Sequence, residues 1–114
     1  MSDLFQHVRS SQGIEEYLLK SNDLKVLMLQ NSSSPVATFM VTYHVGSRNE
    51  AIGYTGSTHL LEHLMFKGSR NYNKEKGTAI WDELQSIGAQ INATTWNDRT
   101  NYFEVVPKEH LEKA

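Results

Sequence analysis

The sequence contains no cysteine, and this absence excludes disulfide bonds and thiolate metal ligands. It also lacks an apolar run long enough to span a bilayer and the basic-then-apolar opening of a secretion signal. Lysine and arginine form no cluster, and the formal net charge is −2, so we expect no nucleic-acid surface. These absences together predict a cytoplasmic protein that binds neither membranes nor nucleic acid.

The composition that remains is typical of a globular protein, with 39% hydrophobic and 21% charged residues among 114. Residues 1–13 are polar and are expected to form an irregular tail. The pattern predicts strands over 14–19, 24–29, 36–45, 89–96 and 99–106, and helices over about 57–67, 77–87 and 107–114. Strands, two helices and then strands predict an α+β domain, in which helices pack on one face of a largely antiparallel sheet.

Two of these elements carry more specific expectations. The strand over 36–45 has apolar residues on both faces, which favours a central strand that is covered on both sides. The helix that begins near residue 57 has Thr55 or Ser57 available as its capping side chain.

The most informative stretch is His59-Leu60-Leu61-Glu62-His63. Two histidines four residues apart lie on one face of a helix, and Glu62 joins them there. Two imidazoles fixed by a rigid element suit zinc, and a neighbouring carboxylate can take a proton from water at the metal. His-x-x-Glu-His is the pattern of the inverted zinc peptidases.

Chance alone would produce this five-residue pattern about 0.02 times in a chain of this length with five His and nine Glu. The alternative is a plain amphipathic helix. In that case Leu60, Leu61, Leu64 and Met65 would form its packed face, and the His and Glu side chains would face water.

Two further segments accompany the motif and carry a resemblance. Gly46–Glu50, His59–Gly68 and Asn92–Tyr102 together resemble the N-terminal domain of the pitrilysin/insulinase-type (M16) zinc peptidases, and most closely its bacterial processing-peptidase-like members. The similarity runs from about Val26 to Ala114. It implies a metallohydrolase-like half-domain that is incomplete.

The resemblance implies roles for five residues. His59 and His63 match the two histidine ligands of Zn²⁺, and Glu62 matches the general base that activates water for attack on a peptide bond. Asn92 and Ala93 match an edge strand whose main chain pairs with an extended peptide substrate, a mode of binding that depends weakly on sequence. The expected function is therefore a zinc-dependent endopeptidase acting on peptides or unfolded proteins.

The chain also departs from the family pattern. The third zinc ligand in these enzymes is a glutamate on a later helix, and residues 64–114 do not reach that position. We therefore expect the natural protein to continue beyond Ala114 and to supply C-terminal segments that complete the site. Alone, the chain is expected to have little or no activity, and bare apolar surface is expected to make it a homo-oligomer.

Two other functions are compatible with the sequence. The family also contains non-catalytic partner subunits, and a peptide-binding homologue of that kind is the main alternative. The intact His59, Glu62 and His63 favour an active enzyme. A small metal-binding protein, complete at this length, would need a third ligand from within the chain or from a second copy.

Overall fold

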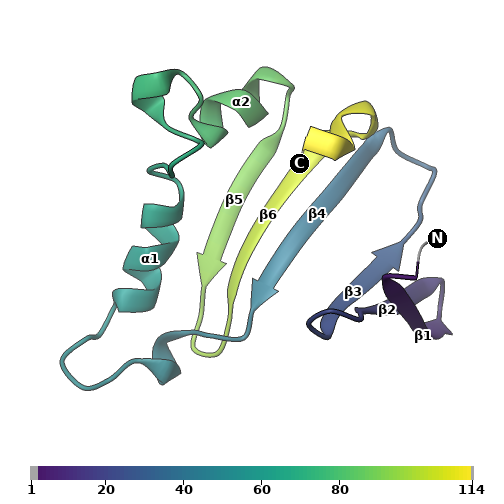
Figure 1. Cartoon of the computed structure of the whole chain (residues 1–114), viewed down its shortest axis with the longest axis horizontal. Helices are drawn as coiled ribbons and strands as arrows, with labels where there is room; N and C mark the ends of the chain where they lie inside the picture. Colours follow the sequence, from purple (N-terminus) through teal and green to yellow (C-terminus); the bar gives the residue numbers. More distant parts are fainter. Residues whose placement is uncertain (1–2, 114) are drawn as a thin grey trace. The chain divides into compact units, whose positions relative to one another are not determined.

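The computed structural model describes residues 3–113, and the chain divides at Ser34 and Pro35 into two compact units. Each unit is built on an antiparallel sheet of three strands, and the second unit also carries helices (Figure 1). The expected α+β class, with a largely antiparallel sheet, is confirmed.

The first unit contains β1 (Phe5–Ser11), β2 (Ile14–Leu19) and β3 (Leu24–Leu29), which pair in the order β1-β2-β3. The expectation of an irregular tail is wrong for Phe5–Ser11, and residues 1–2 lie outside the described part. A two-residue turn explains the extra strand, because Gln12 and Gly13 both have positive φ (51° and 82°). Such turns match the twist of a hairpin.

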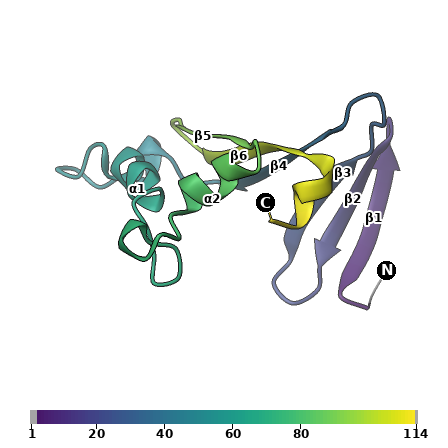
Figure 2. The ribbon, with the colours of Figure 1, turned by 90° about the horizontal axis from the view of Figure 1, so that it is seen from above.

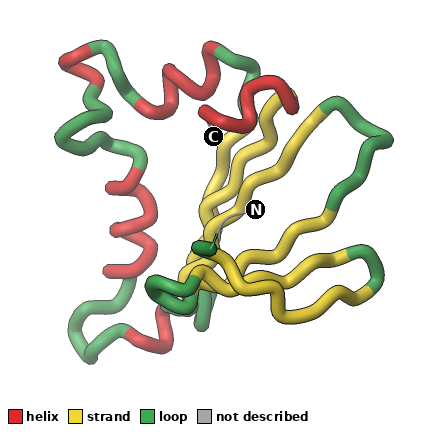
Figure 3. The backbone as a smooth tube through the Cα atoms, turned by 45° about the vertical axis from the view of Figure 1, so that its right-hand side comes forward, coloured by secondary structure: helices red, strands yellow, loops and turns green. Residues whose placement is uncertain are grey.

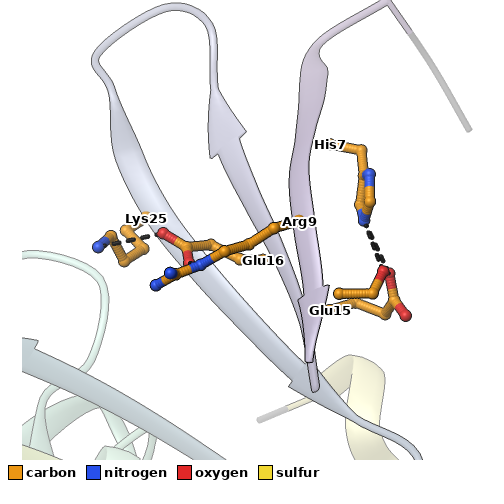
Figure 4. A network of polar contacts seen from close by, with 6 residues as sticks. His7, Arg9, Glu15, Glu16 and Lys25 are labelled. Atoms are coloured by element: carbon orange, nitrogen blue, oxygen red, sulfur yellow. Dashed lines mark hydrogen bonds and ion pairs between the residues drawn. The ribbon is translucent and has the colours of Figure 1, made fainter. Parts of the chain in front are cut away.

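Charged side chains link the strands of this first sheet. Arg9 Nε lies 2.6 Å from Glu16 Oε2, and Lys25 Nζ lies 3.1 Å from Glu16 Oε1, so one carboxylate joins all three strands (Figure 4). The hydrogen bond from Arg9, followed by that from Lys25, holds the pKa of Glu16 below its ordinary value. His7 and Glu15 form a separate pair, 2.8 Å apart.

The second unit contains β4 (Val36–Tyr43), β5 (Gln90–Thr95) and β6 (Thr100–Pro107) in the order β4-β6-β5. The expectation that residues 36–45 form a central strand is wrong, because β6 pairs with both neighbours and leaves β4 at an edge. The β5–β6 hairpin follows the prediction closely.

Between β4 and β5 the chain leaves the sheet and returns (Figure 3). This excursion carries α1 (Ser57–Met65), α2 (Ile80–Ser86) and two 3₁₀ turns, η1 (Ser47–Asn49) and η2 (Lys74–Lys76). Both α-helices lie on one face of the sheet (Figure 2) and contact β5.

The end of the chain differs from its prediction. Pro107 closes β6 instead of opening a helix, and η3 (Lys108–Lys113) is a 3₁₀ helix. The buried core lies where α2 packs on the sheet. It consists of Leu84, Ala89 and Val106, with Ala37, Ile80, Ile87 and Ile91 around them.

The loop after β4 is fixed against the tip of the β5–β6 hairpin. Ser47 N–H donates to Trp96 O at 3.0 Å, and Arg48 N–H donates to Asn97 O at 2.9 Å. The approach is so close that a Cβ on Gly46 would lie 2.1 Å from Trp96 O. Glycine is required at residue 46 because the hairpin backbone occupies the space of a side chain.

Glu50, which follows this loop, caps α1. Its Oε2 accepts the N–H of Gly56 at 2.8 Å, and its Oε1 accepts the N–H of Thr58 at 2.9 Å. The expected cap from Thr55 or Ser57 is wrong, since Gly56 is the N-cap residue and no cap side chain bonds there. A carboxylate at a helix N-terminus satisfies unpaired N–H groups and complements the helix dipole.

We expect Glu50→Ala to lower the thermal midpoint of the chain, and Glu50→Gln to lower it less, because the amide keeps one acceptor oxygen. The two backbone N–H groups hold the pKa of Glu50 below its ordinary 4.5. A lowered pKa stabilises the fold above the unfolded-state pKa, and this stability is lost as the pH falls through the folded-state pKa. Thermal melts across pH, with exposed Glu109→Gln as control, test this. An equal Glu50→Gln deficit at about pH 3 and about pH 7 would contradict it.

Candidate active site

The orientation of α1 is set by a carboxylate. Glu62 is the buried residue of this helix, with 7% of its surface exposed, whereas Leu60, Leu61 and Leu64 are each at least half exposed. The amphipathic alternative predicted the opposite, with the leucines packed and Glu62 in water. The helix therefore turns Glu62, and not its leucines, toward the sheet.

Thr95 on β5 provides the partner that a buried carboxylate needs. Its hydroxyl donates a hydrogen bond to Glu62 Oε2. This bond connects the middle of α1 to the end of β5, across 33 residues of sequence. Nearby, burial and then the charge of Glu62 raise the pKa of Tyr102.

His59 and His63 face each other along α1. Their Nε2 atoms lie 3.1 Å apart, and their ring centroids lie 4.7 Å apart. Two imidazole nitrogens bound to one tetrahedral zinc at about 2.0–2.1 Å would lie about 3.3 Å apart. The pair therefore fits two corners of a zinc site. Imidazole nitrogens are suitable ligands for zinc and for other transition metals.

A cleft of about 290 Å³ joins the motif to the edge strand. It is lined by Glu62 and His63 of α1, by Asn92 and Ala93 of β5, and by Phe66, Lys67 and Trp81. Four of the five residues named from the sequence therefore meet at one cleft. The fifth, His59, lies beside His63.

At the cleft, β5 presents a free edge, since among the described residues its strand partner is β6 alone. Ala93 N–H donates to the side-chain Oδ1 of Asn92 at 2.8 Å. That main-chain donor therefore points to the free edge, not to β6. An added strand can pair with it when the Asn92 side chain moves aside.

The site is incomplete within the described residues. Among residues 3–113, no group of three or more His, Cys, Asp or Glu side chains is arranged to hold a metal ion. The two imidazoles can contribute two ligands to a zinc ion. The neighbouring carboxylate of Glu62 is available to accept a proton.

Sequence reasoning missed two supporting residues. Thr95 and Glu50 were not predicted to contact the motif or its helix. An Asn-Ala-Thr-Thr strand gives no local signal that its last hydroxyl meets a helix 33 residues earlier.

In the described part of the chain, no helix has both the length and the apolar character to cross a membrane.

Several named proteins are similar to this chain in sequence. Mouse insulin-degrading enzyme is 32% identical over 111 residues, which are 96% of this chain and 11% of that protein. The zinc protease PqqE of Helicobacter pylori is 34% identical over 110 residues, 95% of this chain and 24% of that protein. Human cytochrome b-c1 complex subunit 1 is 38% identical over 96 residues, 84% of this chain and 19% of that protein. The chain thus spans at most about a quarter of these relatives.

The fold agrees as well. The crystal structure of a protease from Helicobacter pylori matches 96% of this chain and 24% of its own length, with a TM-score of 0.77 and 32% sequence identity. Some relatives are named as zinc proteases, and others as subunits of larger assemblies. The family model for insulinase, peptidase family M16, matches residues 25–114, and the chain belongs to that family.

Proposed function

We propose that this chain carries the zinc-binding and catalytic part of an inverted zinc endopeptidase, with His59 and His63 as metal ligands and Glu62 as general base. The observation that supports this most is the burial of Glu62 at a cleft beside two paired imidazoles. A helix that exposes its leucines and buries its carboxylate is hard to explain by packing alone.

His59 and His63 would hold the zinc ion, which would supply polarisation of a substrate carbonyl and acidification of a water molecule. Glu62 would accept the proton from that water. The Thr95 hydroxyl bonds Oε2 of Glu62 and leaves Oε1 free for this transfer. Fixing the carboxylate from β5 keeps it within reach of the cleft without making it a ligand.

The substrate proposed for this cleft is an extended peptide or unfolded protein added to β5 as a further strand. Ala93 N–H would donate to a substrate carbonyl in place of Asn92 Oδ1, and the freed Asn92 amide could bond the substrate main chain. Phe66 and Trp81 give the cleft apolar walls for a side chain.

Two imidazoles are a weak zinc site, so the third ligand is proposed to come from polypeptide outside residues 3–113. The proposal for this chain alone is weak zinc binding and little or no peptidase activity. The whole protein would add the missing ligand and close the cleft, as the greater length of the relatives suggests.

Zinc affinity tests the ligand pair. His59→Ala and His63→Ala should each weaken zinc binding by at least about tenfold, because either change leaves a single imidazole. His44→Ala, at an exposed histidine outside the site, should change nothing. Competition with a chromophoric chelator on metal-stripped protein gives the affinities. Equal affinity in wild type and His59→Ala would mean that zinc binds elsewhere.

Peptide cleavage tests the base. Any zinc-dependent cleavage of an unstructured fluorogenic peptide should fall about 10²–10⁴-fold in Glu62→Gln, because the amide cannot accept the proton. Zinc affinity should remain within about twofold of wild type, since Glu62 is not a ligand. Exposed Glu75→Gln is the matched control. Undiminished cleavage by Glu62→Gln would rule out this role.

The exposed leucines of α1 give a prediction for association. We propose that Leu60, Leu61 and Leu64, which are 58%, 56% and 50% exposed, pair two copies of the chain. Sedimentation velocity should show dimers or larger species, and the double variant L60K/L64K should shift them to monomer. Thr55→Lys is the control. A wild-type monomer at all accessible concentrations would contradict this.

A further inference from the structure

A second cavity lies on the helix-covered face of the second sheet, separate from the His59–His63 pair. It has a volume of about 230 Å³ and is walled by apolar side chains from the sheet and both helices, among them Val41, Ile80, Leu84 and Ile91. One carboxylate, that of Glu104 on the central strand β6, lies in this wall. We call this cavity the Glu104 groove.

The Glu104 carboxylate is buried and has no partner within residues 3–113. Only 8% of the residue is exposed, and its Oε2 is inaccessible to solvent and accepts no hydrogen bond from the described residues. Its cross-strand neighbours are Phe39 on β4 and Ile91 on β5. Burial raises the pKa of Glu104, as expected for a carboxyl among apolar side chains without a cation.

Other carboxylates in the chain show that this situation is exceptional. Glu16 in the first unit, which is 7% exposed, contacts Arg9 and Lys25, and Glu62 accepts a hydrogen bond from Thr95. A buried charge without a partner costs far more than a buried pair. An unpartnered carboxylate in the wall of an apolar groove is therefore half of an interaction.

We propose that the Glu104 groove binds a Lys or Arg side chain carried by a polypeptide segment outside residues 3–113. The lining of this groove includes neither the two histidines nor Glu62, and the inference does not depend on peptidase activity. The charged end of the side chain would meet Glu104, and its aliphatic stem would lie along the apolar walls.

Lysine and arginine fit both features of the groove. Their stems pack against apolar surface while the charged head reaches a polar partner. A purely apolar side chain would leave Glu104 unpaired, and a small inorganic cation would leave the walls bare. Charge-assisted hydrogen bonds to a carboxylate are among the stronger ones available to proteins.

The walls of the groove favour a polypeptide as the carrier. Phe39, Tyr43 and Met65, which line it, are each about half exposed, so part of the apolar wall is open to solvent and can be covered by further polypeptide. The relatives are at least four times longer than the matched region, and this chain spans 24% of the Helicobacter pylori protease. Additional polypeptide is therefore available in the family to occupy such a surface.

The first experiment uses n-butylammonium, which reproduces the lysine side chain, and n-butanol, which shares its stem. Titrations of the zinc-free 114-residue chain at about pH 8, followed by amide chemical shifts of groove residues, give both affinities. We expect n-butylammonium to bind about tenfold more tightly than n-butanol. The preference should vanish in Glu104→Gln and persist in Glu109→Gln, an exposed glutamate used as control.

Each other result overturns the proposal. Equal binding of the two probes to the wild type would make the groove merely apolar. A preference that survives Glu104→Gln would place the cation elsewhere, and no shift in groove residues would mean that the groove is closed. Because the protein contains no zinc in this test, none of these results bears on the peptidase proposal.

A second pair of probes tests the polypeptide source. A blocked amphipathic peptide with one central Lys among Leu and Ala should shift the same groove residues at lower concentration than n-butylammonium, and its norleucine counterpart should bind more weakly. If n-butylammonium binds and the lysine peptide does not, the site takes small cations and a polypeptide partner is wrong.

Discussion

The contact between Glu62 and Thr95 determines how the rest of the site is arranged. It holds a carboxylate against the sheet at a position where an amphipathic helix would ordinarily place a leucine. Since the buried residue fixes the rotation of α1, the histidines three residues before and one residue after Glu62 take defined positions at the cleft. A polar contact, not apolar packing, therefore orients this helix. Burying the Glu62 carboxylate costs desolvation free energy, and the hydrogen bond from the Thr95 hydroxyl offsets part of that cost.

The position of α1 along its own axis depends on a second set of contacts that also begins at the β5–β6 hairpin. The hairpin tip holds the loop at Ser47 and Arg48, and Glu50 at the end of that loop caps the first turn of α1. The same hairpin thus fixes the helix at its start through Glu50 and at its middle through Thr95. Two attachments to one rigid element are what a site with ångström tolerances requires.

Local patterns in the sequence were sufficient for the elements with strong periodicity or turn signals. The β5–β6 hairpin, the two helices and the motif on α1 were predicted because each depends on residues within a few positions of one another. Strand β1 was missed because its sequence is too polar to show the alternation of apolar and polar residues that is typical of a strand. The Gln12-Gly13 turn is the local feature that indicates it. The edge position of β4 and the contacts of Thr95 and Glu50 depend on pairings between distant residues, which no local pattern encodes.

The two buried glutamates of the second unit show what a complete and an incomplete polar environment look like in one fold. Both lie on the helix-covered side of the sheet, yet Glu62 has a hydroxyl partner and Glu104 has none among the described residues. An isolated buried charge lowers the free energy of unfolding, and a cation placed beside it would restore part of that stability. The proposed zinc site follows the same logic, because two imidazoles without a third ligand would leave most of the binding energy unrealised. Each of the two proposals therefore requires a further group that the described residues do not supply.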